Sequence, residues 1–145
     1  MKRVALVLTA MMAAACGGSS ASPSAITTPT LNVVTDTFTG TVQPPVNGQG
    51  QFDLHNFTVA GAGSLTITLT AAGPPTTIKM GVGIGSPNAA GTCVLLSSSA
   101  AVEVAASTTP ALSGSLTSAG TYCVAVFDTG NVLQTVTYSI TVVHT

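Results

Sequence analysis

Charge is the property of which this sequence has least. Of its 145 residues only three are Lys or Arg and four are Asp or Glu, and Trp is absent. Lys2 and Arg3 stand at the N-terminus, so Lys79 is the single Lys or Arg beyond it. Nucleic-acid binding depends on several basic contacts to phosphates, and this chain has too few of them. We therefore expect no nucleic-acid partner.

Catalytic and metal-binding motifs are also missing. The sequence has no G-x-S-x-G elbow, no phosphate loop, no zinc helix, no C-x-x-C and no Cys/His cluster at ligand spacing. Each of these would supply a nucleophile, a phosphate cradle or a set of metal ligands. We expect a protein that is not an enzyme and that has no metal and no cofactor.

The N-terminus has the pattern of a sorting signal. A basic start at Met1–Arg3 precedes a twelve-residue apolar run, Val4–Ala15, in which Thr9 is the one polar residue, and then Cys16. Twelve residues are too few for a membrane-spanning helix, which needs about 20. The alanines before Cys16 resemble the lipobox of bacterial lipoproteins, with Ala13 where Leu is usual. The alternative is ordinary secretory cleavage near the same alanines, which leaves Cys16 as a free thiol.

The lipobox resemblance implies that residues 1–15 are a lipoprotein signal peptide and that Cys16 carries the lipid. Residues 16–31 are small, polar and interrupted by proline, which is typical of a flexible tether. The implied location is the bacterial cell envelope, on the outer membrane or cell surface in preference to the cytoplasmic membrane. The expected partner is the membrane itself, through the lipid.

The two remaining cysteines are expected to form a disulfide. Cys93 and Cys123 each stand early in an apolar strand, after a glycine turn. With Cys16 lipidated they are an even pair in an oxidising compartment, where a disulfide is the ordinary outcome.

Residues 32–145 have the alternating pattern of short β-strands separated by turns. The clearest example is Ser64–Thr70, in which aliphatic residues alternate with threonines. About eight such strands with no helical period predict an all-β fold, an antiparallel β-sandwich of jelly-roll or immunoglobulin-like kind. The apolar phase slips between Leu54 and Phe57, and we interpret this slip as a β-bulge near His55 and Asn56.

Three glycines share one face of the expected strand at Ile78–Ile84 and its extension. Gly81, Gly83 and Gly85 alternate with apolar residues and leave a strip of nearly bare backbone. The strip could accept a ligand or partner chain, or it could accommodate the protein's own loop. We favour the protein's own loop.

Four short phrases resemble the bacterial pre-peptidase C-terminal domain over about residues 36–143. They are Phe57–Val59, Gly63–Leu69, Ser118–Val126 and Thr137–Val142. The resemblance implies a non-catalytic β-sandwich of the kind appended to secreted enzymes and linked to secretion, surface association or polymer binding. The acidic residues that often mark the family's middle strands are mostly glycine here, so calcium binding is not implied.

Two groups of residues suggest catalysis only weakly. Asp128-Thr129-Gly130 is similar to the active-site loop of aspartic proteases, which need two such carboxylates and hence a dimer. We favour a β-turn, because Asp and Gly are preferred turn residues. Asp53 and His55, with His144, could suggest a base or a metal pair, and we favour an exposed polar pair beside the expected bulge.

These patterns favour a non-catalytic, lipid-anchored envelope protein that acts as a surface binding or structural module, with an envelope protein as partner. The alternative is a polysaccharide-binding accessory module for secreted hydrolases, although Tyr122 and Tyr138 are expected to face inward and Trp is absent. A remote alternative is a dimeric aspartic protease using Asp128. The oligomeric state is left open by the sequence.

Overall fold

The structure is a computed structural model that describes residues 32–145. The predicted signal peptide (residues 1–15), the tether (16–31) and the lipidation site Cys16 lie outside the described residues. None of the described residues belongs to a helix long and apolar enough to cross a membrane.

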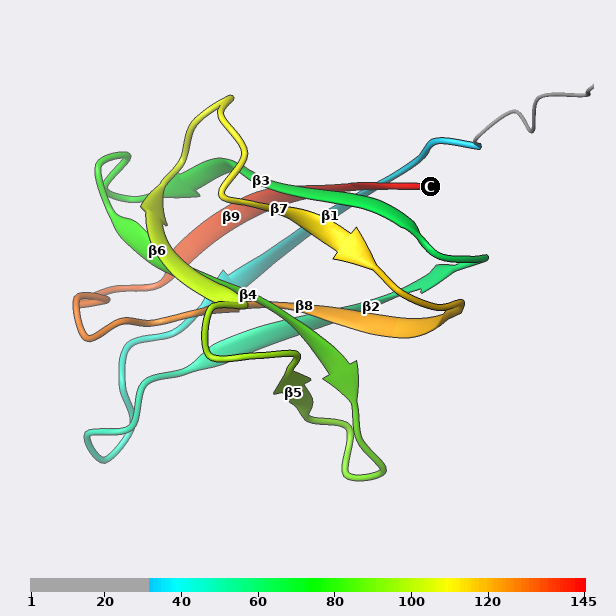
Figure 1. The fold of residues 1–145 in the computed structure, drawn as a ribbon. Helices are drawn as coiled ribbons and strands as arrows, with labels where there is room; N and C mark the ends of the chain where they lie inside the picture. The colour runs from blue at the N-terminus through cyan, green and yellow to red at the C-terminus, as the bar shows by residue number, and fades with distance from the viewer. Residues whose placement is uncertain (1–31) are drawn as a thin grey trace, which may run out of the picture. The chain divides into compact units, whose positions relative to one another are not determined.

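Nine β-strands make up the described part of the chain (Figure 1). Runs in which Thr, Ser or Gly alternate with aliphatic residues form most of them, as the period of two predicts. The strands are β1 (Val34–Val42), β2 (Phe52–Val59), β3 (Gly63–Gly73), β4 (Lys79–Pro87), β5 (Cys93–Leu95), β6 (Ala101–Ala105), β7 (Leu112–Leu116), β8 (Gly120–Phe127) and β9 (Val136–His144).

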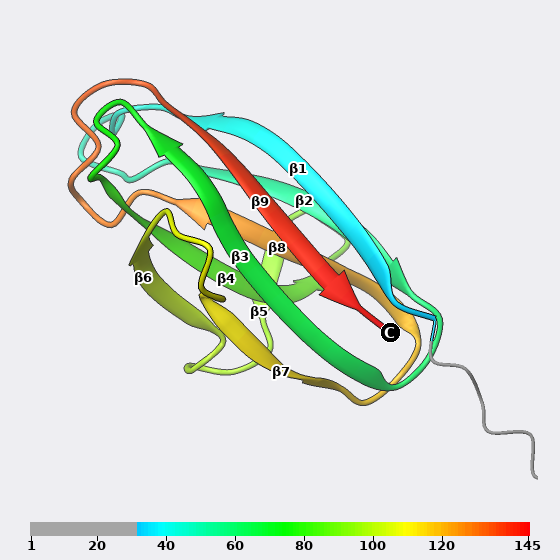
Figure 2. The ribbon, with the colours of Figure 1, turned by 90° about the horizontal axis from the view of Figure 1, so that it is seen from above.

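The strands form two antiparallel sheets that face each other (Figures 1 and 2). One sheet has the order β1-β9-β3-β7, and the other has β2-β8-β4-β5 with β6 also paired to β4. Strand β5 pairs with residues 85–87 of β4 and β6 with residues 79–83, so the two short strands share one edge of β4. The predicted antiparallel sandwich is confirmed, with nine strands in place of about eight.

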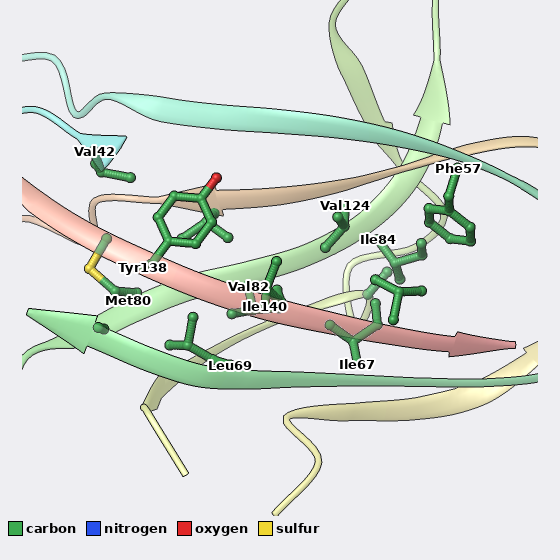
Figure 3. Close-up of a cluster of buried hydrophobic side chains, with 14 of the residues drawn as sticks. Val42, Phe57, Ile67, Leu69, Met80, Val82, Ile84, Val124, Tyr138 and Ile140 are labelled. Atoms are coloured by element: carbon green, nitrogen blue, oxygen red, sulfur yellow. The ribbon is translucent and has the colours of Figure 1, made fainter. Parts of the chain in front are cut away.

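The core lies between the two sheets and consists of the inward side chains of all the strands except β5 (Figure 3). Strand β9 shows the pattern most clearly, because every second residue is fully or almost fully buried while the threonines between them face outward. Burial of these aliphatic groups is the main stabilising contribution, at roughly 25 cal/mol per Å² of apolar surface. The inward residues of the four central strands are Leu65, Ile67 and Leu69 (β3), Met80, Val82 and Ile84 (β4), Tyr122, Val124 and Val126 (β8), and Val136, Tyr138, Ile140 and Val142 (β9).

The predicted bulge near His55 and Asn56 is wrong. Strand β2 pairs with β8 in unbroken register along its whole length, and the register shift lies instead in β3, between Leu69 and Ala71. The alternation of apolar residues breaks because polar and apolar residues exchange faces along β2, while the alternation of the backbone continues unchanged. The first half of β2 carries polar residues on its inner face and apolar residues on its outer face.

The glycine strip of β4 accommodates the protein's own chain, as favoured from the sequence. A side chain at Gly81 would meet the ring of Phe127, and one at Gly83 would lie 2.8 Å from Leu95. At Gly85 it would meet the Val94 carbonyl and the sulfur of Cys93. The strip is therefore covered by β5 and by a ring from β8, and Cys93 is joined to Cys123 by the expected disulfide.

Substitution of Gly85 tests this packing. Gly85→Ala places a methyl group against the backbone of β5, and we expect it to lower the free energy of unfolding by about 1–3 kcal/mol, the usual cost of overpacking. Gly114→Ala in β7 is the matched control, because nothing lies within 4 Å of the added carbon. Urea unfolding of the two variants gives the comparison. Equal stabilities would contradict the packing of β5 on the strip.

Candidate functional site

The outer face of the five-stranded sheet carries an apolar groove of about 380 Å³. We call it the outer groove. Its lining residues are mainly apolar and come from β2, β5 and β8 and from the loop residues next to these strands. They are Gly50, Gln51, Phe52, Leu54, Thr92, Cys93, Leu95, Ala125, Phe127 and Asp128.

Strand register explains how the outer groove forms. Phe52 lies opposite Phe127, and Leu54 lies opposite Ala125, so four outward side chains of β2 and β8 lie together. Strand β5 adds Leu95 from the other side, where the disulfide holds it near β8. Phe52 is 60% exposed and Leu95 is 41% exposed. Exposed apolar residues that gather around a hollow mark interaction sites more often than isolated ones do.

Asp128 directly follows β8 at one end of the outer groove and organises the loop that comes after it. Its Oδ1 accepts hydrogen bonds from the backbone N–H groups of Gly130, Asn131 and Val132, at 2.8, 3.0 and 3.0 Å. Its own N–H donates to the carbonyl of Gln51. These bonds show that the carboxylate organises the loop after β8, which agrees with the structural role favoured from the sequence.

A polar cluster lies between the sheets, where the sequence led us to expect an exposed pair. The Nε2 atom of His55 is 2.8 Å from the hydroxyl of Tyr138, and it is 3.9 Å from Oδ2 of Asp53. Phe38 stacks on the imidazole with ring centroids 4.8 Å apart. A side chain at Gly40 would meet both Asp53 and Tyr138, so glycine at this position leaves room for the cluster. The expectation of an exposed pair is wrong, because Asp53 and His55 share the inward face with Phe57.

The pKa of Tyr138 is raised in this cluster. Burial, and after it the hydrogen bond and negative charge of Asp53, raise the pKa of Tyr138 far above its usual value of about 10. The neutral phenol is therefore the form that the folded protein holds.

His144 does not join Asp53 and His55. It is 2% exposed, its Nε2 lies 3.1 Å from Oδ2 of Asp36, and its ring packs against Phe57. Within residues 32–145, no three His, Cys, Asp or Glu side chains come together as metal ligands do. The two His–Asp pairs are thus separate, and in each the aspartate is partly exposed.

Reasoning from sequence missed the outer groove and the role of Tyr138. The spacing along β2 could have placed the polar pair. Asp53 and His55 lie four and two residues before Phe57, so all three share one face of the strand. The bulge assumed at His55 and Asn56 would have put Asp53 and His55 on the opposite face from Phe57, and it therefore led to the wrong placement. The contribution of β5 to the groove had no local signal beyond the cysteine pair.

Comparison with known protein families, with curated proteins and with solved structures finds no match for this chain. The description of the fold as an all-β sandwich of two antiparallel sheets therefore rests on the strand topology alone.

The phenol of Tyr138 predicts a stability that depends on pH in alkaline solution. Above about pH 10 the unfolded tyrosine ionises while the folded one stays neutral, so the unfolded state binds fewer protons and stability falls. We expect a loss of about 1.4 kcal/mol per pH unit there, which Tyr138→Phe removes. At pH 7 the variant should be less stable by about 1–2 kcal/mol, because His55 and Asp53 lose a partner.

Denaturant unfolding at pH 7, 10 and 11 measures both effects. The stability difference between the wild type and Tyr138→Phe should shrink as the pH rises above 10. A difference that stays constant to pH 11 would show that Tyr138 is not a buried neutral phenol.

Proposed function

We propose that this chain is a non-catalytic, lipid-anchored protein of the bacterial cell envelope that binds a partner protein through the outer groove. The observation that carries the proposal is the cluster of exposed apolar side chains around that groove, led by Phe52 and Leu95. The Cys93–Cys123 disulfide supports a location outside the cytoplasm, because disulfides persist in oxidising compartments.

The chemistry of the groove suits an uncharged apolar ligand. The charged residue in its lining is Asp128, and the turn uses that carboxylate. Recognition would then come from burial of apolar surface with a few polar contacts at Gln51 and Thr92. An apolar side chain of an envelope protein, inserted between Phe52 and Leu95, fits these requirements.

The resemblance to the pre-peptidase C-terminal domain fits the same proposal. Those domains are non-catalytic sandwiches linked to secretion and surface association, and this chain has a two-sheet sandwich. Placed behind a lipidated Cys16 and a tether of residues 16–31, such a domain would work at the membrane surface.

Polysaccharide binding is the second candidate, and its support is the exposed ring of Phe52. Carbohydrate sites generally stack sugars on exposed aromatic faces. Tyr122 and Tyr138 are 7% and 3% exposed, so they offer no such face. A single exposed aromatic ring supports sugar binding less strongly than the apolar groove supports protein binding.

The groove test compares two exposed apolar positions inside it with one outside. Phe52→Ser and Leu95→Ser should each weaken capture of the partner from an envelope extract by about tenfold or more, because buried aromatic and aliphatic anchors dominate binding energy. Leu133→Ser is the control, since Leu133 is 89% exposed and lies outside the groove lining. Capture that survives both groove variants would overturn the proposal. Selective retention on a glycan array, lost in Phe52→Ser, would favour polysaccharide binding.

The anchor has its own test. Cells that express the full chain and are fed labelled palmitate should incorporate the label into this protein, which should then sediment with membranes. Cys16→Ser should abolish both, whereas Ser19→Ala in the tether should change neither. Unlabelled protein that is released in soluble form would support ordinary secretory cleavage instead.

A further inference from the structure

Strand β1 is an edge strand with little of the usual protection. All nine of its residues pair with β9, from Val34 opposite His144 to Val42 opposite Val136, with no bulge. Among the described residues no strand pairs with its other edge, and Figure 2 shows β1 at the rim of its sheet. Natural edge strands are usually short, bulged or marked by Lys or Pro, because their free N–H and C=O groups attract another strand. β1 has nine residues, no bulge, no Lys and no Pro, and its one charged residue, Asp36, is held by His144 at 3.1 Å, whereas β7 at the opposite edge has five residues.

The sequence of β1 is almost the same in both directions about Phe38. Val34 matches Val42, Thr35 matches Thr41 and Thr37 matches Thr39. Asp36 and Gly40 are the one unmatched pair. A two-fold axis at Phe38 would therefore place like residues opposite each other in an antiparallel pair of β1 strands.

We propose that two copies of this chain dimerise through β1, paired antiparallel with Phe38 opposite Phe38 of the partner. The two four-stranded sheets would join into one continuous sheet of eight strands. This arrangement is an isologous contact, in which the same surface of both copies meets around a two-fold axis.

Both faces of the strand fit this register. On the outer face Thr37 meets Thr39 of the second copy, and cross-strand Thr pairs are favourable. On the inner face Asp36 meets Gly40, which has no side chain to displace. The carboxylate of Asp36 already has a partner in His144, with Nε2 and Oδ2 3.1 Å apart.

Charge specifies the register. With the axis at Phe38 the two Asp36 residues lie four residues apart along the joined strands, or about 13 Å at about 3.3 Å per residue. An axis shifted to Asp36 would set the two carboxylates directly opposite each other, which is destabilising. A shift toward Gly40 would bring Pro44 against the pairing edge, where it lacks an N–H.

Exposure along β1 is consistent with a contact surface. Val34, at the start of the strand, is 42% exposed, although valine side chains are usually buried. Phe38 is only partly buried and has the imidazole of His55 on one side. A second copy would cover the apolar parts of both residues.

Charge reversal on the outer face tests the dimer. Thr37 and Thr39 are exposed, so Thr37→Lys/Thr39→Lys should fold normally while setting two pairs of lysines opposite each other. We expect the full-length wild-type chain, purified in detergent, to sediment with twice the chain mass and the double-lysine variant with one chain mass. Thr37→Glu/Thr39→Glu should behave in the same way. An equimolar mixture of the lysine and glutamate variants should restore the dimer.

The matched control places lysines at the other edge of the same sheet. Ser113→Lys/Ser115→Lys in β7 adds the same charge to exposed positions and should stay dimeric. Circular dichroism checks that each variant is folded. A wild-type chain with the mass of one copy, or a double-lysine variant with the mass of two, would overturn the proposal.

Cysteine cross-linking tests the register. Thr37→Cys and Thr39→Cys variants, when mixed, should form an intermolecular disulfide, because these positions lie opposite each other with Cβ atoms about 4.5–5.5 Å apart. Either variant alone would bring its cysteines only to a diagonal spacing of about 7–8 Å, beyond the reach of a disulfide. Equal cross-linking of each variant alone would contradict the axis at Phe38.

Discussion

The outer surface of the five-stranded sheet depends on one covalent constraint, the disulfide between Cys93 and Cys123. It draws β5 against β8 across the position of Gly85, where any side chain would meet the Val94 carbonyl and the Cys93 sulfur. In the chain-entropy description, closing a loop of about 30 residues contributes roughly 3–4 kcal/mol. The glycines of β4 and the cystine are therefore parts of one arrangement. The outer groove exists because that arrangement places Leu95 near the apolar residues of β2 and β8.

Although the chain has few charged residues, two aspartates at the margin of the sandwich point toward inward-facing polar side chains. Asp53 and His55 lie beside Tyr138 on the inner side of β2, and Asp36 meets the almost fully buried His144. Both groups lie along the β1 and β2 side of the sandwich. Buried polar groups are costly unless they are hydrogen-bonded. Each of these side chains has a partner, but the Nδ1 atom of His144 is buried without one. The pairing fixes how the edge strand β1 sits on the core, because Phe38 stacks on the same imidazole.

The outer groove and the free edge of β1 belong to different sheets and do not compete for residues. A dimer through β1 would therefore carry two grooves. If both grooves met partners in one membrane plane, binding at the first would raise the effective concentration for the second. A modest apolar groove on each copy would then give firmer attachment at a surface than one copy alone.

The sequence alone determined the fold class, the strand alternation, the disulfide and the turn at Asp128, because each rests on local periodicity, cysteine count or turn chemistry. It misplaced the bulge and left Asp53 and His55 outside, because a switch in residue type along β2 looks the same as a switch in backbone phase. Only the tertiary structure decided which strands are neighbours. That choice brought Tyr138 to His55 across 83 residues and formed the outer groove from three separated strands. It also left β1 at an edge, since no local pattern states which strand lacks a neighbour.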